Sequence, residues 1–224
     1  MIIDRKMGGE KKMTTLECIK SRKSVRKFKD EKVSREVIIK CLEAATQAPS
    51  PKHQQNWYFA VLENKERVQQ LTKVVEASHE RIANLCTDEK EKQLFMKFMK
   101  YYTLFKDAAV VVLVYAKPYD MIEEKILRAS GASEEEIEIL KAPQSCAQAI
   151  GAAVENFMLV ATELGYGTCY MTGPTHAKRE IEALIGEVPH EYELMSMIAM
   201  GKPEDETSDK PKRLPLEKVV TFID

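Results

Sequence analysis

The hydrophobic pattern of the chain changes repeatedly between the period of a helix and that of a strand. Apolar residues recur every three to four positions after Ser34, which predicts an amphipathic helix that ends before Pro49. Short apolar runs predict core strands instead. Four such strands are expected, at 57–62, 110–115, 168–171 and 194–200. The first is apolar at almost every position, so we expect it to be covered on both faces.

Capping signals and apolar stripes predict further helices. A capping box, Thr14-x-x-Glu17, opens a short helix, and the same pattern recurs at Ser133. The segment 145–164 predicts a long, alanine-rich helix with almost no charge, which must be buried in its own core or against a partner chain. Other helices are expected at 64–76, 88–105 and 176–185. An apolar stripe within 88–105 is expected to pack in the core: Leu94, Phe95, Phe98, Met99 and Tyr102.

The order of these elements predicts the fold class. Helices and strands mix without regular alternation and without internal repeats, which favours an α+β fold with a mainly antiparallel central sheet flanked by helices. We expect a flexible leader over 1–13 and a single domain over 14–224. Within that domain we expect an acidic insertion at about 118–142 and a C-terminal arm at about 202–224 that wraps a dimer partner.

Composition and charge exclude several classes of protein. The chain has 224 residues, of which 44% are hydrophobic and 31% charged, as in ordinary globular proteins. A net charge of −1 argues against a nucleic-acid partner. The longest apolar run, Ala108 to Ala116, is far shorter than the roughly 20 residues of a membrane span. Five cysteines without zinc-ligand spacing, and no secretory signal, predict reduced thiols, no metal site and a cytoplasmic location.

Basic residues nevertheless gather near both ends of the chain. The segment Lys20 to Lys29 carries six basic side chains and no acidic one, and a second cluster lies at 210–213. Arginine forks match a phosphate bidentately, and the Ser24 hydroxyl adds a donor. Neither a Gly-x-Gly-x-x-Gly nor a Walker A motif is present, so any bound phosphate would be held by side-chain cations.

Six short motifs follow one another in a fixed order. They are Arg22-Lys-Ser-Val-Arg-Lys-Phe28, Ala48-Pro-Ser50 ahead of Trp57, Leu164-Gly165, Met171-Thr172-Gly173, Gly201-Lys-Pro203 and Arg213-Leu-Pro-Leu-Glu-Lys-Val219. This order resembles the nitroreductase-like family of FMN-dependent oxidoreductases. The resemblance covers most of the chain, from Leu16 to Val220.

The resemblance implies a homodimeric enzyme that transfers hydride from NADH or NADPH, through FMN, to small acceptors such as nitroaromatics or quinones. The flavin performs the chemistry, so no catalytic protein residue is implied. The residues implied to hold the flavin's phosphate and ribityl chain are Arg22, Lys23, Ser24, Arg26, Lys212 and Arg213. A loop is implied to reach the flavin across the dimer interface through Pro49, Ser50, Pro51, His53 and Gln55. The backbone expected beside the ring belongs to Met171, Thr172 and Gly173.

Three positions depart from the family pattern. His53 replaces an asparagine, Asn56 replaces a proline, and Thr172 stands where a glutamate is often seen. These changes concern the substrate more than the cofactor. Two alternatives therefore stay open. One is a specialised flavin relative that reductively dehalogenates a substrate or consumes its own flavin, and the other is a non-catalytic flavin-binding module.

Overall fold

The sheet at the centre of the molecule has the strand order β1-β2-β4-β3, and every neighbouring pair is antiparallel. The computed structural model describes residues 13–204 and 210–223. The strands are β1 (Trp57–Leu62), β2 (Val110–Ala116), β3 (Gly167–Met171) and β4 (Glu193–Gly201). The α+β class with a mainly antiparallel sheet is therefore confirmed. Most of the predicted leader, and part of the predicted C-terminal arm, lie outside the described residues.

Burial across the sheet depends on where each strand lies. β2 is paired on both sides, and all of its residues are buried. β1 is an edge strand among the described residues: Trp57 and Leu62 are buried, Tyr58 is exposed, and the three residues between are half-buried. Both faces of this strand do pack against the core: Leu62 and Ala60 contact one cluster, and Trp57, Phe59 and Val61 contact the other. The cover is incomplete only at Tyr58, near the start of this edge strand.

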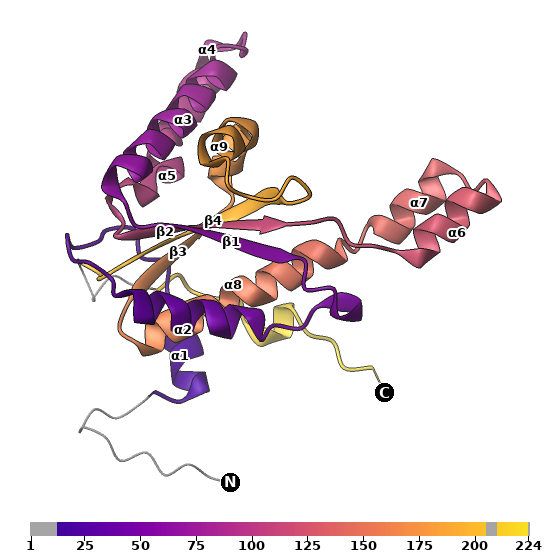
Figure 1. Cartoon of the computed structure of the whole chain (residues 1–224), viewed down its shortest axis with the longest axis horizontal. Coiled ribbons are helices and arrows are strands. Elements are labelled where there is room, and N and C mark those ends of the chain that lie inside the picture. Colours follow the sequence, from indigo (N-terminus) through magenta and orange to yellow (C-terminus); the bar gives the residue numbers. More distant parts are fainter. Residues whose placement is uncertain (1–12, 205–209, 224) are drawn as a thin grey trace.

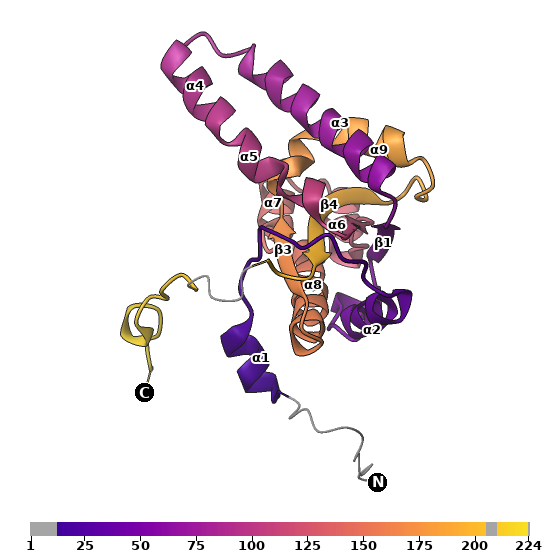
Figure 2. The same cartoon turned by 90° about the vertical axis from the view of Figure 1, so that its left-hand side faces the viewer.

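Helices cover both faces of the sheet (Figures 1 and 2). One side holds α1 (Thr15–Ser21), α2 (Arg35–Thr46) and α8 (Ser145–Glu163), and the other holds α3 (Lys65–Ala83) and α9 (Lys178–Ile185). The packing of α2 against α8 buries Ile38 and Cys41 with the alanine-rich side of α8, as predicted for an apolar helix. Within the described ranges, no helix is both long and apolar enough to cross a membrane.

Two helix starts carry the capping boxes that the sequence predicts. The Thr14 hydroxyl accepts a hydrogen bond from the Glu17 N–H, while the Glu17 carboxylate accepts one from the Thr14 N–H. Ser133 and Glu136 repeat this exchange at the start of α7 (Glu134–Lys141). Such signals are local, so the sequence positions these ends correctly.

The segment predicted as one helix over 88–105 is divided into three. It forms α4 (Glu89–Lys97), α5 (Met99–Tyr102) and the 3-10 turn η2 (Leu104–Asp107). Figure 2 shows α3 and α4 extending together beyond the sheet. For this reason Leu94 and Phe98 are 57% and 42% exposed, and the expectation that they pack in the core is wrong.

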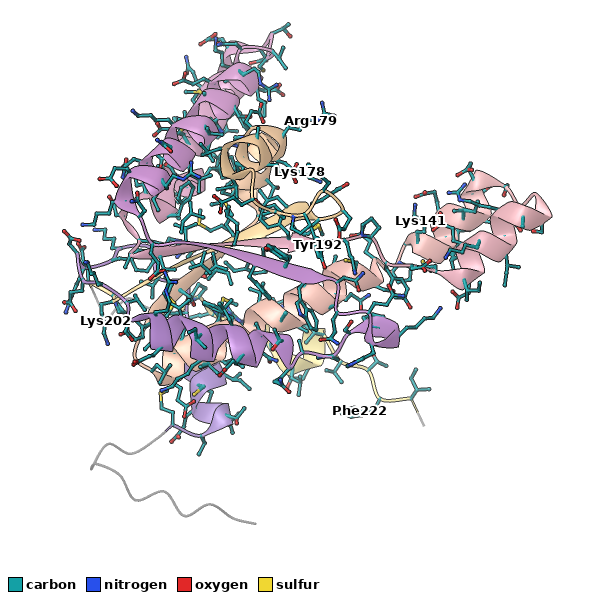
Figure 3. All side chains as sticks on the ribbon, in the orientation of Figure 1. Lys141, Lys178, Arg179, Tyr192, Lys202 and Phe222 are labelled. Carbon is teal, nitrogen blue, oxygen red and sulfur yellow. The ribbon has the colours of Figure 1, made fainter. Side chains whose placement is uncertain are left out.

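Two further segments of the described chain project from its body. After β2, α6 (Ile122–Ser130) and α7 form a helical arm, at the right of Figure 1. The C-terminal residues 211–223 are exposed and contain one short 3-10 turn, η4 (Leu216–Lys218). Phe222 and Ile223 are 87% and 93% exposed, and Figure 3 shows Phe222 well away from the sheet. These segments fall within the ranges predicted as an insertion and as a C-terminal arm, whose roles stay predictions.

Candidate functional site

The first basic segment lies along the outer edge of β3. Ser24 forms a parallel bridge with Thr168, and the Val25 N–H donates to the Thr168 carbonyl oxygen at 2.8 Å. Val25 is buried here, and a Cβ atom on Gly167 would lie 2.6 Å from its side chain. The close approach therefore requires glycine, and it holds the backbone between Arg22 and Arg26 against the strand.

The second basic cluster meets the first at the end of α1. The Lys210 ammonium donates to the carbonyl oxygens of Ile19 and Lys20, each at 3.0 Å. These carbonyls belong to the last turn of the helix, where a cation is favoured. The Arg22 Nε lies 3.4 Å from the Glu155 Oε1 of α8. Residues about 190 positions apart are thus brought together beside the same helix end.

The basic side chains at this helix end lie close enough together for their charges to affect the pKa of Lys210. Partial burial, followed by the positive charges of Arg22 and Arg213, holds the pKa of Lys210 below its ordinary value. Burial raises the pKa of the Cys169 thiol, whereas the positive charges of Arg26 and Arg22 lower it. Because Cys169 belongs to β3, both guanidinium groups lie close enough to this strand to affect it.

This donor set fits a small anion. Arginine and lysine side chains form short, charge-assisted hydrogen bonds with phosphate oxygens. The buried Thr168 hydroxyl has no hydrogen-bond partner among the described residues, which leaves one more polar group beside the cluster. Of the other predicted phosphate ligands, Lys23 and Ser24 are half-buried, and Lys212 is exposed.

The other end of β3 carries the residues predicted to face a cofactor ring. Met171 is buried, Thr172 is exposed, and Gly173 opens the 3-10 turn η3 (Gly173–Ala177). A Cβ atom on Gly173 would lie 2.3 Å from the Tyr102 ring, so the turn packs against α5 only with glycine here. Thr172 lies four positions after Thr168, or about 13 Å along the strand direction. An elongated ligand can therefore lie along this edge.

Two histidines that sequence reasoning missed meet at η3: His79 of α3, which is buried, and His176, which is half-buried within η3 itself. His79 is fully buried, stacks on Phe95 with ring centroids 3.9 Å apart, and bonds the Phe95 carbonyl oxygen through Nε2 at 2.9 Å. His176 Nδ1 lies 3.2 Å from the Ser78 hydroxyl, and the two imidazole centroids are 5.5 Å apart. The histidines are 97 positions apart in the chain, and no local pattern marks them as neighbours.

Acidification is expected to destabilise the protein through His176. Burial, and then the neighbouring His79, lower the pKa of His176 in the folded state. A histidine side chain in the unfolded chain has a pKa near 6.5. Just below that pH, the unfolded chain therefore binds a proton at this position, whereas the folded chain does not yet bind it. The free energy of unfolding should therefore fall as the pH drops from about 7.5 through the folded pKa, which urea denaturation would measure.

A matched pair of variants isolates this effect. His176→Gln should flatten the dependence of stability on pH, whereas His190→Gln, at an exposed loop position, should leave it unchanged. Equal pH dependence in the His176→Gln variant and the unchanged protein would show that His176 is not the group responsible.

The backbone of the loop before β1 is strained at three residues. Lys52, His53 and Gln55 have φ values of 49°, 55° and 47°, in the left-handed region. Non-glycine residues pay roughly 1–2 kcal/mol each for that conformation. The Ser50 hydroxyl supports it by accepting the Gln55 N–H at 2.7 Å, and the Gln55 Nε2 lies 3.2 Å from the His53 Nε2. Strain of this kind is concentrated at functional sites.

Within one chain, this loop lies far from the basic cluster. The loop enters β1 and the cluster lies on β3, at opposite edges of the sheet. Three strand spacings separate these edges, or about 14 Å. Pro49, His53 and Gln55 are exposed, while Ser50 and Pro51 are half-buried. The predicted site residues therefore form two groups, and a single copy does not bring them together.

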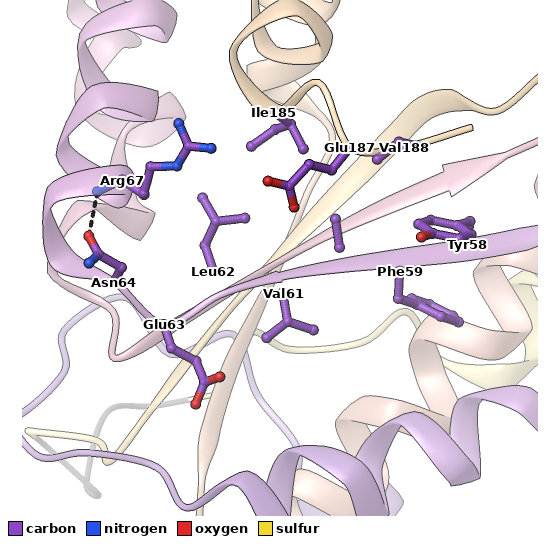
Figure 4. A pocket seen from close by; sticks show the side chains of 11 residues that line it. Tyr58, Phe59, Val61, Leu62, Glu63, Asn64, Arg67, Ile185, Glu187 and Val188 are labelled. Atoms are coloured by element: carbon purple, nitrogen blue, oxygen red, sulfur yellow. Dashed lines mark hydrogen bonds between the residues drawn. The ribbon is translucent and has the colours of Figure 1, made fainter. Parts of the chain in front are cut away.

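A groove follows the outer edge of β1 (Figure 4). It has a volume of about 300 Å³ and lies between β1, the start of α3 and the segment after α9. Tyr58, Leu62, Ile185 and Val188 give it an apolar lining, and Arg67 lies at one end. None of the predicted cofactor-binding residues lines it. The groove is a surface beside an unpaired strand rather than part of the basic cluster.

The chain is similar to known proteins over most of its length. The model of the Nitroreductase family matches residues 19–202. A BluB-like flavoprotein from Clostridium difficile 630 is 36% identical, with a TM-score of 0.90 over 95% of this chain and 100% of that one. A Bacteroides fragilis nitroreductase with bound FMN shares the fold, at 19% identity and a TM-score of 0.68 over 94% and 98% of the two chains. An iodotyrosine deiodinase from Thermotoga neapolitana is 27% identical over 91% of this chain and 96% of its own length.

Proposed function

The chain belongs to the Nitroreductase family, a family of flavin oxidoreductases, and from this premise we propose that it is an FMN-dependent NAD(P)H oxidoreductase. It reduces small acceptors such as nitroaromatics or quinones, with NADH or NADPH as the hydride donor in a ping-pong reaction. Bound FMN would supply the hydride-transfer chemistry. The protein binds the cofactor, orients the ring and excludes water, and no protein nucleophile is needed.

The observation that carries this proposal is the meeting of basic side chains from both ends of the chain beside β3. The charges of Arg22 and Arg213 both act on Lys210 at the end of α1, and those of Arg26 and Arg22 act on Cys169 of β3. A phosphate dianion would relieve the repulsion at Lys210 and accept hydrogen bonds from these side chains. The proposed phosphate ligands are Arg22, Lys23, Ser24, Arg26, Lys212 and Arg213.

The ring of the cofactor is proposed to lie at the far end of β3. Backbone groups of Met171, Thr172 and Gly173 would face it, and the exposed Thr172 side chain would set the polarity beside it. The turn η3 contains the half-buried His176, whose ring lies beside that of the buried His79 of α3, and this packing supports the backbone. A rigid backbone donor at this point would orient the ring and tune its reduction potential.

A homodimer is proposed to complete the site. The loop with Pro49, Ser50, Pro51, His53 and Gln55 lies at the opposite edge of the sheet from the basic cluster, so it would serve the flavin of a second copy. The exposed apolar run over 214–223 would lie in the groove beside β1 of that copy, because the run and the groove are both left uncovered in one chain. We accordingly propose one catalytic domain over 14–224, with the α6–α7 arm as its insertion.

The proposal is tested by the colour of the purified protein and its response to reductant. The chain should be yellow after incubation with FMN, and anaerobic titration with NADH or NADPH should bleach the flavin absorbance. A protein that stays colourless would overturn the proposal. A yellow protein that neither nicotinamide bleaches would instead be a non-catalytic flavin-binding module.

A second reaction deserves a test because of the deiodinase relative, which is 27% identical over 91% of the chain. In reductive dehalogenation, two electrons and a proton replace a carbon–halogen bond by a carbon–hydrogen bond, and halide leaves. Release of iodide from iodotyrosine by the reduced protein, faster than it reduces nitroaromatics or quinones, would favour this reaction. Loss of FMN itself under aerobic, reducing conditions would favour the flavin-consuming alternative.

A further inference from the structure

One side chain of the strained loop before β1, that of Gln54, makes two hydrogen bonds with the stem of the α6–α7 arm. The Gln54 Nε2 donates to the Asp120 carbonyl oxygen at 2.7 Å, and the Asp120 N–H donates to the Gln54 Oε1 at 2.9 Å. Both halves of the carboxamide therefore pair with a single backbone residue 66 positions away. A glutamine used in this way imitates the paired hydrogen bonds between two antiparallel strands.

Neighbouring residues strengthen the same junction. Asn56 is fully buried, and its Nδ2 donates to the carbonyl oxygens of Lys117 and Pro118, each at 3.1 Å. The Lys117 N–H donates in turn to the Asn56 carbonyl oxygen at 3.0 Å. This gives the departure from the family's proline a structural reason. An ion pair of 2.9 Å, between Lys52 of the loop and Glu123 at the start of α6, completes the junction.

The α6–α7 arm also contacts the body of the chain at the start of α8. Figure 1 shows α6 and α7 projecting away from the sheet, connected to it by the strand end after β2 and by the start of α8. At the second connection, the Cys146 thiol donates to the same Lys117 carbonyl oxygen at 3.3 Å. A movement of the stem at 117–123 therefore has to change the loop at 52–56, whose left-handed residues leave it little freedom to adapt.

We propose that Gln54 is a positioning residue that couples the α6–α7 arm to the loop, so that the two move as one unit. The part of this inference that concerns FMN rests on the proposed function, whereas the coupling of arm and loop does not. Because coupling between sites is reciprocal, a substrate that contacts the arm would change the affinity of the loop for the cofactor, and the cofactor would restrain the arm.

Amide hydrogen exchange of the ligand-free protein tests the coupling directly. Gln54→Ala should raise exchange at least tenfold at the Asp120 amide and across both 50–56 and 117–124. The matched control is Gln69→Ala, since Gln69 donates its amide to a single backbone oxygen, that of Lys106, on the opposite side of the sheet. Unchanged exchange in the folded Gln54→Ala variant would overturn the proposal, as would an equal increase in both variants.

A second pair of variants distinguishes the loss of this junction from a general loss of structure. Lys52→Met removes the ion pair between loop and arm, while Lys125→Met removes a pair with Asp120 that lies within the stem and α6. Only the first should raise exchange in both the loop and the arm stem. Equal responses to the two substitutions would contradict a specific junction.

Added FMN then tests the reciprocal effect. In the unchanged protein, FMN should slow exchange at 117–124 severalfold, and this protection should be lost in Gln54→Ala even when FMN is saturating. Retained protection would overturn the coupling to the cofactor. If the unchanged protein binds no FMN, the proposed function fails, and the ligand-free comparison still decides whether Gln54 joins the arm to the loop.

Discussion

Replacing Arg22 with alanine is expected to raise the dissociation constant for FMN about 100-fold. Arg22 is half-buried where the two ends of the chain meet, and its charge acts on both Lys210 and Cys169. Charge-assisted hydrogen bonds contribute about 1.5–3 kcal/mol each, and 2.7 kcal/mol corresponds to a factor of about 100 in affinity. Quenching of flavin fluorescence on titration with apoprotein would measure the change.

Two further variants make this result specific. Arg22→Lys keeps the charge but loses the planar fork, so its affinity for FMN should lie between those of the unchanged protein and Arg22→Ala. Arg35→Ala removes an exposed guanidinium that pairs with Glu63 on the surface, and it should change the dissociation constant less than twofold. FMN binding by Arg22→Ala as tight as that of the unchanged protein would rule out a phosphate site beside β3.

The basic cluster illustrates what the sequence can and cannot predict. Each half can be recognised in the sequence as a cluster of basic residues. The contact of Lys210 with the end of α1, however, joins residues about 190 positions apart. The resemblance to a family supplied the idea that both halves serve one phosphate. No local signal predicts that Thr168 would lie beside the first half with a buried hydroxyl that has no partner among the described residues, because that depends on how the segment from Arg22 to Arg26 pairs with β3.

The errors in the predicted fold have one physical cause. Capping boxes at Thr14 and Ser133 depend on residues three positions apart, so they were predictable. The burial of Leu94 and Phe98 depends on how far α4 extends past the sheet, and that of Tyr58 depends on which strand ends the sheet. A hydrophobic pattern indicates which residues can be buried. The tertiary arrangement, and a second chain where one is present, decide which of them are.

The loop before β1 shows the same limit at the site itself. Its sequence, Pro49 to Gln55, predicts an irregular segment, but left-handed conformations at Lys52, His53 and Gln55 occur without a glycine to indicate them. They are stabilised by the local hydrogen bond from the Gln55 N–H to the Ser50 hydroxyl and by contacts with the arm stem more than 60 positions away. The strained conformation therefore depends in part on tertiary contacts, and sequence reasoning could assign the loop a role only through the family resemblance.

Mixed dimers of two defective chains are expected to recover one of two FMN sites. One chain carries Arg22→Ala, and the other carries His53→Ala with Gln55→Ala in the loop. In either homodimer, both sites are defective and FMN binding is weak. In the mixed dimer, the intact basic cluster of the loop variant faces the intact loop of the Arg22→Ala chain, because these groups lie at opposite edges of the sheet. Co-expression with two different affinity tags isolates this dimer, and flavin absorbance gives its FMN content.

The count of bound FMN decides between two architectures. A site shared between chains predicts one tightly bound FMN for each mixed dimer and close to none for either parent at the same concentration. A site built within one chain predicts no recovery, since each chain of the mixed dimer would keep its own defect. Failure of the two tagged chains to purify together would contradict the dimer itself. Recovery of one site would show that the loop and the basic cluster, about 14 Å or more apart across three strand spacings within a copy, meet only between copies.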